Sequence, residues 1–77
     1  MADLTDITID TSGLICPLPI LTVKKRIKPL TSPAIIRIIT TDKTSAADFP
    51  EFFKLTHLEL ISTDTDEGRV IFTVAKK

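Results

Sequence analysis

The apolar residues of this chain change their spacing several times, and the order of these changes restricts the folds that it can adopt. Near the start, Ile7 and Ile9 alternate with polar residues, a period of two that predicts a first strand near residues 5–10. From Pro17 onward, apolar residues recur at intervals of three and four, which predicts a helix whose first residue is this proline. The apolar face of this helix consists of Ile20, Val23, Ile27 and Leu30.

The same change of period occurs again in the second half of the chain. Residues 34–40 are almost continuously apolar and rich in β-branched side chains, which predicts a strand in the middle of a sheet. A second helix is predicted over residues 46–55, with Thr44 or Ser45 as its N-cap and with Pro50 in about its first turn. Its apolar face consists of Phe49, Phe52 and Phe53.

Two further strands are expected to complete the order β-α-β-α-β-β. We predict the third strand at residues 56–64, a hairpin turn at residues 66–68, and a fourth strand in which Val70, Phe72 and Val74 lie at alternate positions. The first two strands should be parallel, through a right-handed crossover, and the last two antiparallel. Because each helix has a single apolar face, the predicted fold is α+β, a two-layer sandwich with two helices on one face of a four-stranded mixed sheet.

The length and charge of the chain exclude several classes of function. A chain of 77 residues allows one small domain, residues 1–77, and leaves little room for the deep pocket of an enclosed enzyme active site. A carrier, a binding module or a subunit is favoured instead. Ten acidic and ten basic side chains give a net charge of zero, and the only aromatic residues are four phenylalanines. Both features argue against direct nucleic-acid binding, which usually uses surplus positive charge and exposed rings.

The sequence also lacks the usual signals for secretion or membrane insertion. The first six residues, MADLTD, are partly acidic and contain no apolar stretch of the kind that a secretory signal has. The longest uncharged run, residues 11–23, contains two prolines and is too short to span a bilayer. We therefore expect a cytoplasmic protein without a membrane partner.

The segment DTSGLICPLP, residues 10–19, places the single cysteine of the chain at the expected junction between a loop and a helix. Cys16 cannot form an intramolecular disulfide, and together with the single histidine, His57, it cannot supply the four ligands of a zinc site. We therefore predict neither a metal nor another cofactor, and any sulfur chemistry must use a lone thiol. The competing interpretation is that Cys16 is a buried packing residue, as free cysteines often are.

A position at the start of a helix would make the thiol of Cys16 reactive, because the partial positive charge there favours a thiolate. If Cys16 is the N-cap, Pro17 and Pro19 offer no N–H, and the N–H of Leu18 is the main donor that can reach the sulfur. The two proline rings also stiffen the entry to the helix. The apolar residues expected around the thiol are Leu14, Ile15 and Leu18. Such a thiol is well placed to enter the active site of a partner protein. It is poorly placed to react with a small substrate that this chain would have to bind alone.

These residues resemble the signature of a known family. Asp10, Gly13, Cys16, Pro17 and Pro19 form the pattern D-x-x-G-x-x-C-P-x-P, which is similar to that of the TusA/SirA-type small sulfur-carrier family. The resemblance extends along most of the chain, and its further matches are Asp42, Asp48-Phe49-Pro50, His57 and Lys76-Lys77. The chain departs from the family pattern before the second strand, where it has Pro33-Ala34, and before the histidine, where it has Thr56.

The resemblance implies both a fold and a function. The family has a β-α-β-α-β-β two-layer sandwich, in agreement with the periodicities. Its cysteine, Cys16 here, accepts a persulfide sulfur from a donor protein, a cysteine desulfurase or a rhodanese-like protein. The cysteine then passes the sulfur to an acceptor protein, toward tRNA thiolation, molybdenum cofactor or sulfur metabolism. Cys16 is therefore the candidate reactive residue, and the other four residues of the pattern are supporting ones.

Two other functions remain open at this point. The first is a non-catalytic interaction or regulatory module of the same fold, whose interaction patch consists of Leu14, Ile15 and Leu18. The second is an RNA-contacting domain that uses the basic side of the first helix, which the zero net charge weakens. That side consists of Lys24, Lys25, Arg26 and Lys28, and we interpret it first as a solvated helix face.

Several polar residues have a structural and a functional interpretation. His57 could donate a proton near the thiol, although a turn cap or a solvated histidine is the preferred interpretation. Asp10 could contact the cysteine loop or a partner, or close the turn with its neighbours through hydrogen bonds to the backbone. Asp42 and Asp48 could bind a metal, but no further acidic cluster supports such a site.

Overall fold

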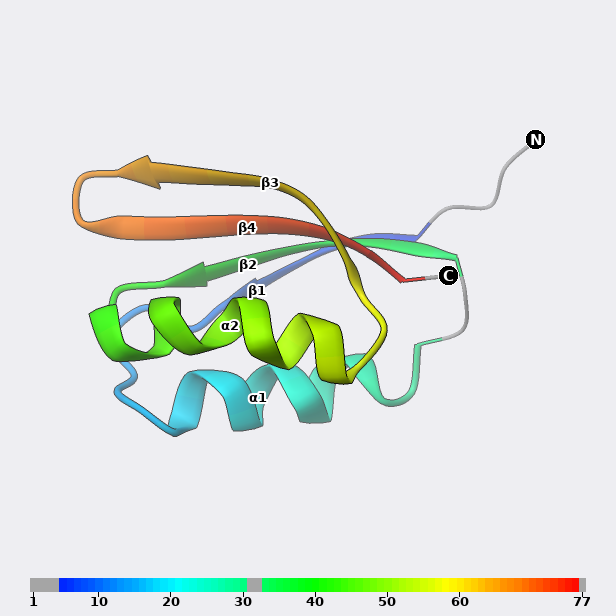
Figure 1. Ribbon diagram of the computed structural model, residues 1–77, viewed down its shortest axis with the longest axis horizontal. Coiled ribbons are helices and arrows are strands. Elements are labelled where there is room, and N and C mark those ends of the chain that lie inside the picture. Colours follow the sequence, from blue (N-terminus) through cyan, green and yellow to red (C-terminus); the bar gives the residue numbers. More distant parts are fainter. Residues whose placement is uncertain (1–4, 31–32, 77) are drawn as a thin grey trace.

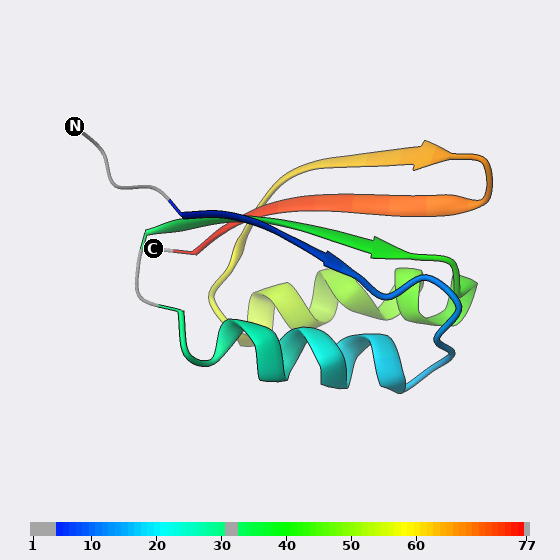
Figure 2. The same cartoon turned by 180° about the vertical axis from the view of Figure 1, so that it is seen from behind.

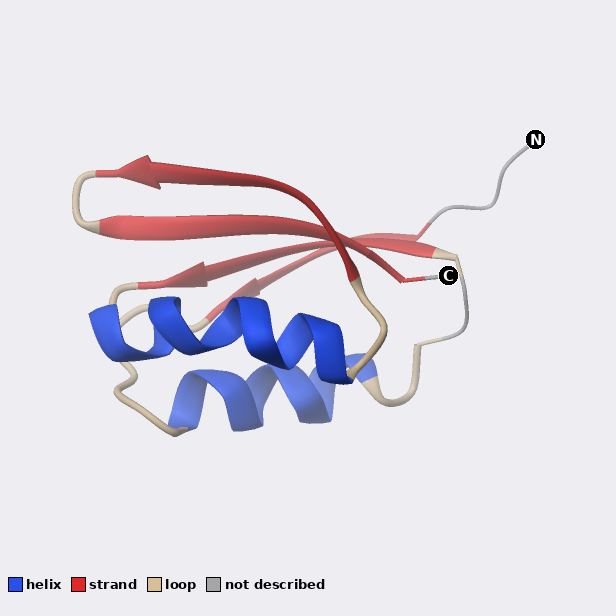
Figure 3. Cartoon of the chain, in the orientation of Figure 1, coloured by secondary structure: helices blue, strands red, loops and turns tan. Residues whose placement is uncertain are grey.

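The structure, a computed structural model, describes residues 5–30 and 33–76 and has the predicted element order (Figure 1). The elements are β1 (Thr5–Asp10), α1 (Leu18–Ile27), β2 (Ala34–Thr40), α2 (Lys43–Leu55), β3 (Glu59–Asp66) and β4 (Arg69–Lys76). The two helices lie side by side on one face of the sheet, as the colouring by secondary structure in Figure 3 makes clear. The predicted two-layer α+β sandwich is therefore confirmed.

The four strands form one mixed sheet in the order β1-β2-β4-β3. β1 and β2 are parallel, and β3 and β4 are antiparallel, as predicted. The sheet is joined by an antiparallel pairing of β2 with β4. The apolar strand β2 lies inside the sheet, between β1 and β4. Because β1 and β2 run in the same direction, the loops that follow them leave from the same end of the sheet (Figure 2). This arrangement brings the cysteine loop next to the start of α2.

The core lies between the helices and the sheet and is built around the four phenylalanines, all of which are buried. The ring centroids of Phe49 and Phe53 each lie 5.4 Å from that of Phe72, a separation at which aromatic pairs stabilise a fold. The aliphatic side chains that complete the core are Ile9, Val23, Ile27, Ala34, Ile36, Ile38, Leu58 and Val74. Helix α1 thus stays attached to the sheet through the apolar face that the periodicity predicted.

Helix α2 begins at Lys43, three residues earlier than predicted, and the predicted N-caps Thr44 and Ser45 are wrong. The N-cap is Asp42, whose carboxylate accepts a hydrogen bond from the N–H of Ser45. Because the helix starts earlier, Pro50 lies well inside it instead of in its first turn. Pro50 is exposed, so the helix accommodates the missing N–H on its solvent side.

The third strand begins at Glu59, so its predicted start at residue 56 is wrong, because residues 56–58 terminate α2. Two hydrogen bonds close this terminus, from the N–H of His57 to the carbonyl of Lys54 and from the N–H of Leu58 to the carbonyl of Phe53. At the other end of β3 the strand continues to Asp66, and the hairpin turn is shorter than predicted. It consists of Glu67 and Gly68, with φ 48° and 81°, as a two-residue type I′ turn requires.

Candidate functional site around Cys16

Cys16 lies in the loop between β1 and α1, and its side chain is exposed and free. The interpretation of this cysteine as a buried packing residue is therefore wrong. The loop begins at Thr11, which is fully buried and donates a hydrogen bond from its N–H to the carbonyl of Ile39 at 2.8 Å. The Thr11 hydroxyl donates to the same carbonyl oxygen. The loop is thus fixed to the end of β2 before it leaves the sheet.

The turn that precedes the cysteine is closed by Asp10 and Gly13. The Asp10 carboxylate accepts a hydrogen bond from the N–H of Ser12 at 2.9 Å, which confirms the structural interpretation of Asp10. Hydrogen bonds from the hydroxyl and the N–H of Ser12 lower the pKa of the Asp10 carboxyl. Gly13 has φ 84°, the left-handed conformation that glycine adopts without a steric cost, and its N–H donates to the hydroxyl oxygen of Thr41 at 2.9 Å.

The Asp42 carboxylate joins the cysteine loop to the start of α2. One of its oxygens, Oδ2, accepts from the N–H of Cys16 at 3.2 Å and from the N–H and hydroxyl of Ser45 at 2.9 and 2.8 Å. The hydrogen bonds from Ser45, first from its N–H and then from its hydroxyl, lower the pKa of the Asp42 carboxyl, and the Cys16 N–H contributes less. The backbone of the cysteine is therefore held by a charged group 26 residues away along the chain.

Asp42 is the site residue whose role the sequence analysis missed, since it was identified there only by resemblance and as a rejected metal ligand. A usable signal was present in the sequence. An aspartate directly after a strand and three residues before Ser45 has the spacing of an N-cap whose side chain reaches the third helical residue. Its contact with Cys16 has no local signal, because it arises from the parallel pairing of β1 and β2.

The start of α1 differs from the prediction by one residue. Pro17 is the N-cap and Leu18 the first helical residue, so Cys16 lies one position before the cap. The Cys16–Pro17 peptide bond is cis, and the N–H of Leu18 donates to the carbonyl of Ile15 at 2.8 Å. The expectation that the Leu18 N–H is the main donor to the sulfur is therefore wrong, because the loop itself uses this donor.

The surroundings of the thiol are apolar and open to solvent. Pro19 is buried and anchors the first turn of α1 in the core, whereas Ile15 and Leu18 keep 67% and 47% of their surface exposed. Leu14, the third member of the predicted apolar ring, is half-buried. The thiol thus projects from a fixed backbone and has accessible hydrocarbon next to it, an arrangement that a second macromolecule can cover.

His57 does not belong to this site. It follows the C-terminal end of α2, whereas Cys16 precedes the N-terminal end of α1, and these two ends lie at opposite ends of the helical layer (Figure 1). His57 is exposed, and its backbone N–H donates to the carbonyl of Lys54, which agrees with the preferred interpretation of a turn-capping or solvated residue. Across residues 5–30 and 33–76, the structure contains no group of three or more side chains of the metal-binding types that could hold a metal ion.

No helix among the described residues is long and apolar enough to cross a membrane. The helices α1 and α2 have 10 and 13 residues and each has one polar side. Both lengths are short of the roughly 20 apolar residues that span a bilayer.

Comparisons with known proteins agree with the geometry. The family model described as Sulfurtransferase TusA matches residues 7–76. A protein of Allochromatium vinosum named sulfur carrier protein TusA is 41% identical over 76 residues, which cover 99% of each chain. A protein of the same name from Pseudomonas entomophila is 31% identical and covers 100% of this chain and 98% of its own.

A solved structure shows the same fold. The crystal structure of a SirA-like protein from Desulfitobacterium hafniense superimposes with a TM-score of 0.77. The match covers 90% of this chain and 95% of the other at 21% sequence identity. With a family model that spans nearly all of the sequence and curated relatives that cover its whole length, the chain belongs to the TusA family.

Proposed function

We propose that this protein is a sulfur carrier in which Cys16 holds a persulfide sulfur between a donor protein and an acceptor protein. The observation that carries this proposal is the exposed position of the only cysteine, on a loop whose backbone is fixed by Asp42 and by a buried proline in the following helix turn. The names of the curated relatives support the same role. Residues 1–77 would act as a single sulfur-carrier domain, in the cytoplasm.

The transfer needs no oxidant or reductant. The Cys16 thiolate attacks the terminal sulfur of a persulfide on the donor, the bond between the two donor sulfurs breaks, and the donor leaves as a thiolate. Cys16 then carries the persulfide. In the second step an acceptor thiolate attacks the outer sulfur, and Cys16 leaves as a thiolate, ready for another cycle.

The supporting residues of the motif have separate roles in this proposal. Gly13 and Asp10 shape the turn that sends the chain toward the thiol. Pro17 and Pro19 restrict the backbone on the other side of Cys16, and Pro19 is buried. A thiol on a restricted backbone loses less conformational entropy when two proteins bring their sulfurs into line, and this favours transfer within a complex.

The donor is a cysteine desulfurase or a rhodanese-like protein, because these are the protein classes that present a persulfide to the carriers of this family. The acceptor is a protein of tRNA thiolation, of molybdenum-cofactor synthesis or of sulfur metabolism.

The proposal is tested by incubation with a cysteine desulfurase and cysteine, or with a rhodanese and thiosulfate, followed by intact-mass measurement. We expect a gain of one sulfur atom that dithiothreitol removes and that Cys16→Ser does not show. The absence of a reducible adduct with both donor classes would contradict the proposal.

The second candidate function is a non-catalytic interaction module, which is favoured by the exposed side chains of Ile15 and Leu18. In that case the sulfur is incidental, and a Cys16→Ser variant should restore the phenotype of a deletion strain as well as the wild type does. A sulfur carrier requires the opposite result, because serine cannot hold a persulfide.

A further inference from the structure

The face of the sheet that points away from the helices is a second surface of the molecule, separate from the cysteine loop. Both helices pack on one face of the sheet, and none of the described segments lies over the other (Figure 1). Because side chains alternate along a strand, the neighbours of the buried Ile36, Ile38 and Phe72 point to this other side. We call the outward side chains of the four strands the open face. Those on the two inner strands are Ile35, Arg37, Ile39, Ile71, Thr73 and Ala75.

The inner strands form an apolar stripe along the middle of the open face. Ile39 and Ile71 lie opposite each other in the pairing of β2 with β4, and Ile35 lies opposite Ala75. All four side chains are half-buried, so part of their hydrocarbon remains in contact with water. The outward positions of a sheet with one solvated face are normally polar. The stripe is therefore a feature that a purely solvated face does not need.

Arg37 interrupts this stripe at its centre. It lies between Ile35 and Ile39 along β2 and opposite Thr73 of β4. Its side chain is exposed, and the structure records no ion pair or hydrogen bond between its guanidinium and another described residue. Arginine is enriched among the residues that dominate binding energy at protein interfaces, and its donors match a carboxylate. The centre of the open face is thus suited to an acidic side chain within an apolar surface.

The two edge strands add negative charge on both sides of the stripe. On β1, Asp6 and Asp10 lie in register with the outward isoleucines of β2. On β3, Asp64 lies opposite Ile71 of β4. All three aspartates are exposed. A partner that covers the stripe therefore meets carboxylates along both of its edges.

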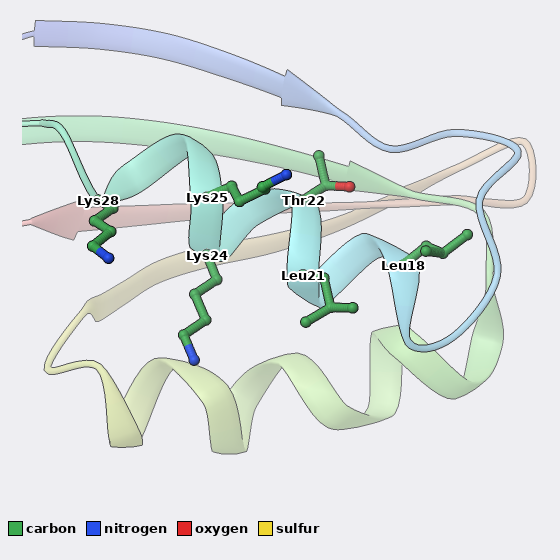
Figure 4. Close-up of a pocket in the computed structure, with 6 residues that line it drawn as sticks. All are labelled: Leu18, Leu21, Thr22, Lys24, Lys25 and Lys28. Atoms are coloured by element: carbon green, nitrogen blue, oxygen red, sulfur yellow. The ribbon is translucent and has the colours of Figure 1, made fainter.

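Much of the positive charge of the chain lies in the other layer. Lys24, Lys25 and Lys28 line a groove on α1, on the helical side of the molecule (Figure 4). Arg69, at the hairpin end of the open face, forms an ion pair with Asp66 at 2.9 Å. The edges of the open face thus keep their negative charge available for a partner.

We propose that the open face is the docking site for a basic amphipathic helix of a partner protein, which adds a third layer to the two-layer fold. The apolar side of this helix covers the isoleucines, and an acidic residue within that side meets Arg37. Lysine or arginine on both flanks of the helix meets the aspartates of β1 and β3. This inference goes beyond the proposed function and does not use Cys16.

The dimensions of the sheet fit a single helix. The edge strands β1 and β3 are separated by three strand spacings, about 14 Å. A helix with its side chains is about 10–12 Å in diameter, so it fills the space between the edges and brings both flanks within reach of them. The stripe from Ile35 to Ile39 is about 13 Å long, a length that about nine helical residues cover.

Charge favours a basic helix over other occupants of the open face. A second copy of this chain would bring the same acidic edges against one another. The phosphates of an RNA or of an anionic membrane would meet the same repulsion. A basic helix instead gains from both edges, with an apolar centre inside a rim of charges, which is the usual construction of a protein interface.

The probe for this site is a synthetic helical peptide of about 14 residues, long enough to cover the stripe. It carries leucines at intervals of three and four on one side, a glutamate at the middle of that side, and lysines on both flanks. Fluorescence anisotropy with the full chain should show binding at least about tenfold tighter than that of a peptide with the same composition in scrambled order. Amide chemical shifts in NMR spectra should change most at the outward residues of β2 and β4 and stay unchanged on α1.

Charge reversals test the predicted contacts. Arg37→Glu should weaken binding about tenfold, and a peptide with lysine in place of its central glutamate should recover it. Asp6→Lys/Asp64→Lys should weaken binding about tenfold at low salt and less at high salt. The matched control is Asp48→Lys/Glu51→Lys, which changes the net charge by the same amount at exposed positions on α2 and should stay within about twofold of the wild type. Circular dichroism checks that each variant is folded.

The outcomes also separate this inference from the proposed function. Cys16→Ser should bind the peptide as the wild type does, so a failure of sulfur transfer leaves the docking site standing, and a failure of peptide binding leaves the carrier role standing. No preference over the scrambled peptide, equal effects of the two double variants, or shifts that map to α1 would overturn the proposal. So would a dimer in sedimentation velocity that Arg37→Glu dissociates, since this would assign the open face to a second copy.

Discussion

Replacement of His57 by glycine should make this protein more stable without slowing sulfur transfer. His57 has φ 60°, in the left-handed region where a Cβ atom collides with the backbone. It occupies the position after the α2 C-cap that glycine usually fills, in a terminus closed by the hydrogen bonds of His57 and Leu58 to Lys54 and Phe53. The histidine side chain is exposed, so its removal leaves no cavity.

Two opposing effects set the size of the change. The left-handed conformation costs a residue with a side chain about 1–2 kcal/mol, and glycine avoids this cost. Glycine also has a more flexible unfolded state, which costs about 0.5–1 kcal/mol on folding. The expected gain in the free energy of unfolding is about 0.5–1 kcal/mol, which corresponds to about 2–8 °C in Tm for a domain of this size.

Urea and thermal denaturation followed by circular dichroism measure this gain. His57→Ala is one control, because it keeps the Cβ atom and should stay within about 0.5 kcal/mol of the wild type. Thr56→Gly is the second control. Thr56 has φ −101°, and its hydroxyl donates to the carbonyl of Phe52 at 2.7 Å, so glycine there should lower stability by about 1 kcal/mol. A His57→Gly variant no more stable than the wild type would refute the reasoning, and a loss of sulfur transfer would restore His57 as a functional residue.

Three further predictions concern the core, the hairpin and pH. Phe49→Leu should lower the free energy of unfolding by about 1–2 kcal/mol in urea, because it removes the ring contact with Phe72, and an unchanged value would contradict this core. Glu67→Asn should raise Tm slightly, because asparagine tolerates φ 48° in a type I′ turn, and a lower Tm would exclude that turn. Because hydrogen bonds lower the folded-state pKa of Asp42, its ionised form stabilises the fold above the ordinary value of 3.8, and this contribution should disappear as pH falls below that value. Asp42→Asn should therefore flatten the acid limb of a stability-against-pH curve, and a curve identical to that of the wild type would contradict the assignment.

The strands of this fold could be predicted from sequence because their signals are local. The observed bounds of β1 and β2 agree with the predicted ones. The prediction rested on the alternation around Ile7 and Ile9 and on the β-branched run at residues 34–40. The start of α2 was placed too late, because Asp42, Thr44 and Ser45 are all of residue types that commonly cap a helix, and the spacing of Asp42 before Ser45 was not used. The third strand was predicted to start too early, at residue 56. Only the backbone conformation of His57 shows that residues 56–58 close α2.

The site was predicted in part for a similar reason. The local sequence placed Cys16 in the loop before the helix and placed Gly13 in the preceding turn, as the structure shows, since these features lie within a few residues of one another. The hydrogen bond from the Cys16 N–H to Asp42 links positions 26 residues apart, and it exists only because β1 and β2 are parallel neighbours. The use of the Leu18 N–H by Ile15 depends on the loop conformation, which the spacing of the two prolines does not specify.

The central claim is that one exposed thiol both receives and releases a sulfur atom. A single-turnover experiment with cysteine labelled at sulfur tests it most directly. A cysteine desulfurase loads the protein, the donor is removed, and an acceptor protein from one of the three proposed pathways is added. We expect the label to map to the peptide that contains Cys16 and then to leave it as the acceptor gains label. Label that stays on Cys16 with acceptors from all three pathways, or that also appears on Cys16→Ser, would contradict the account.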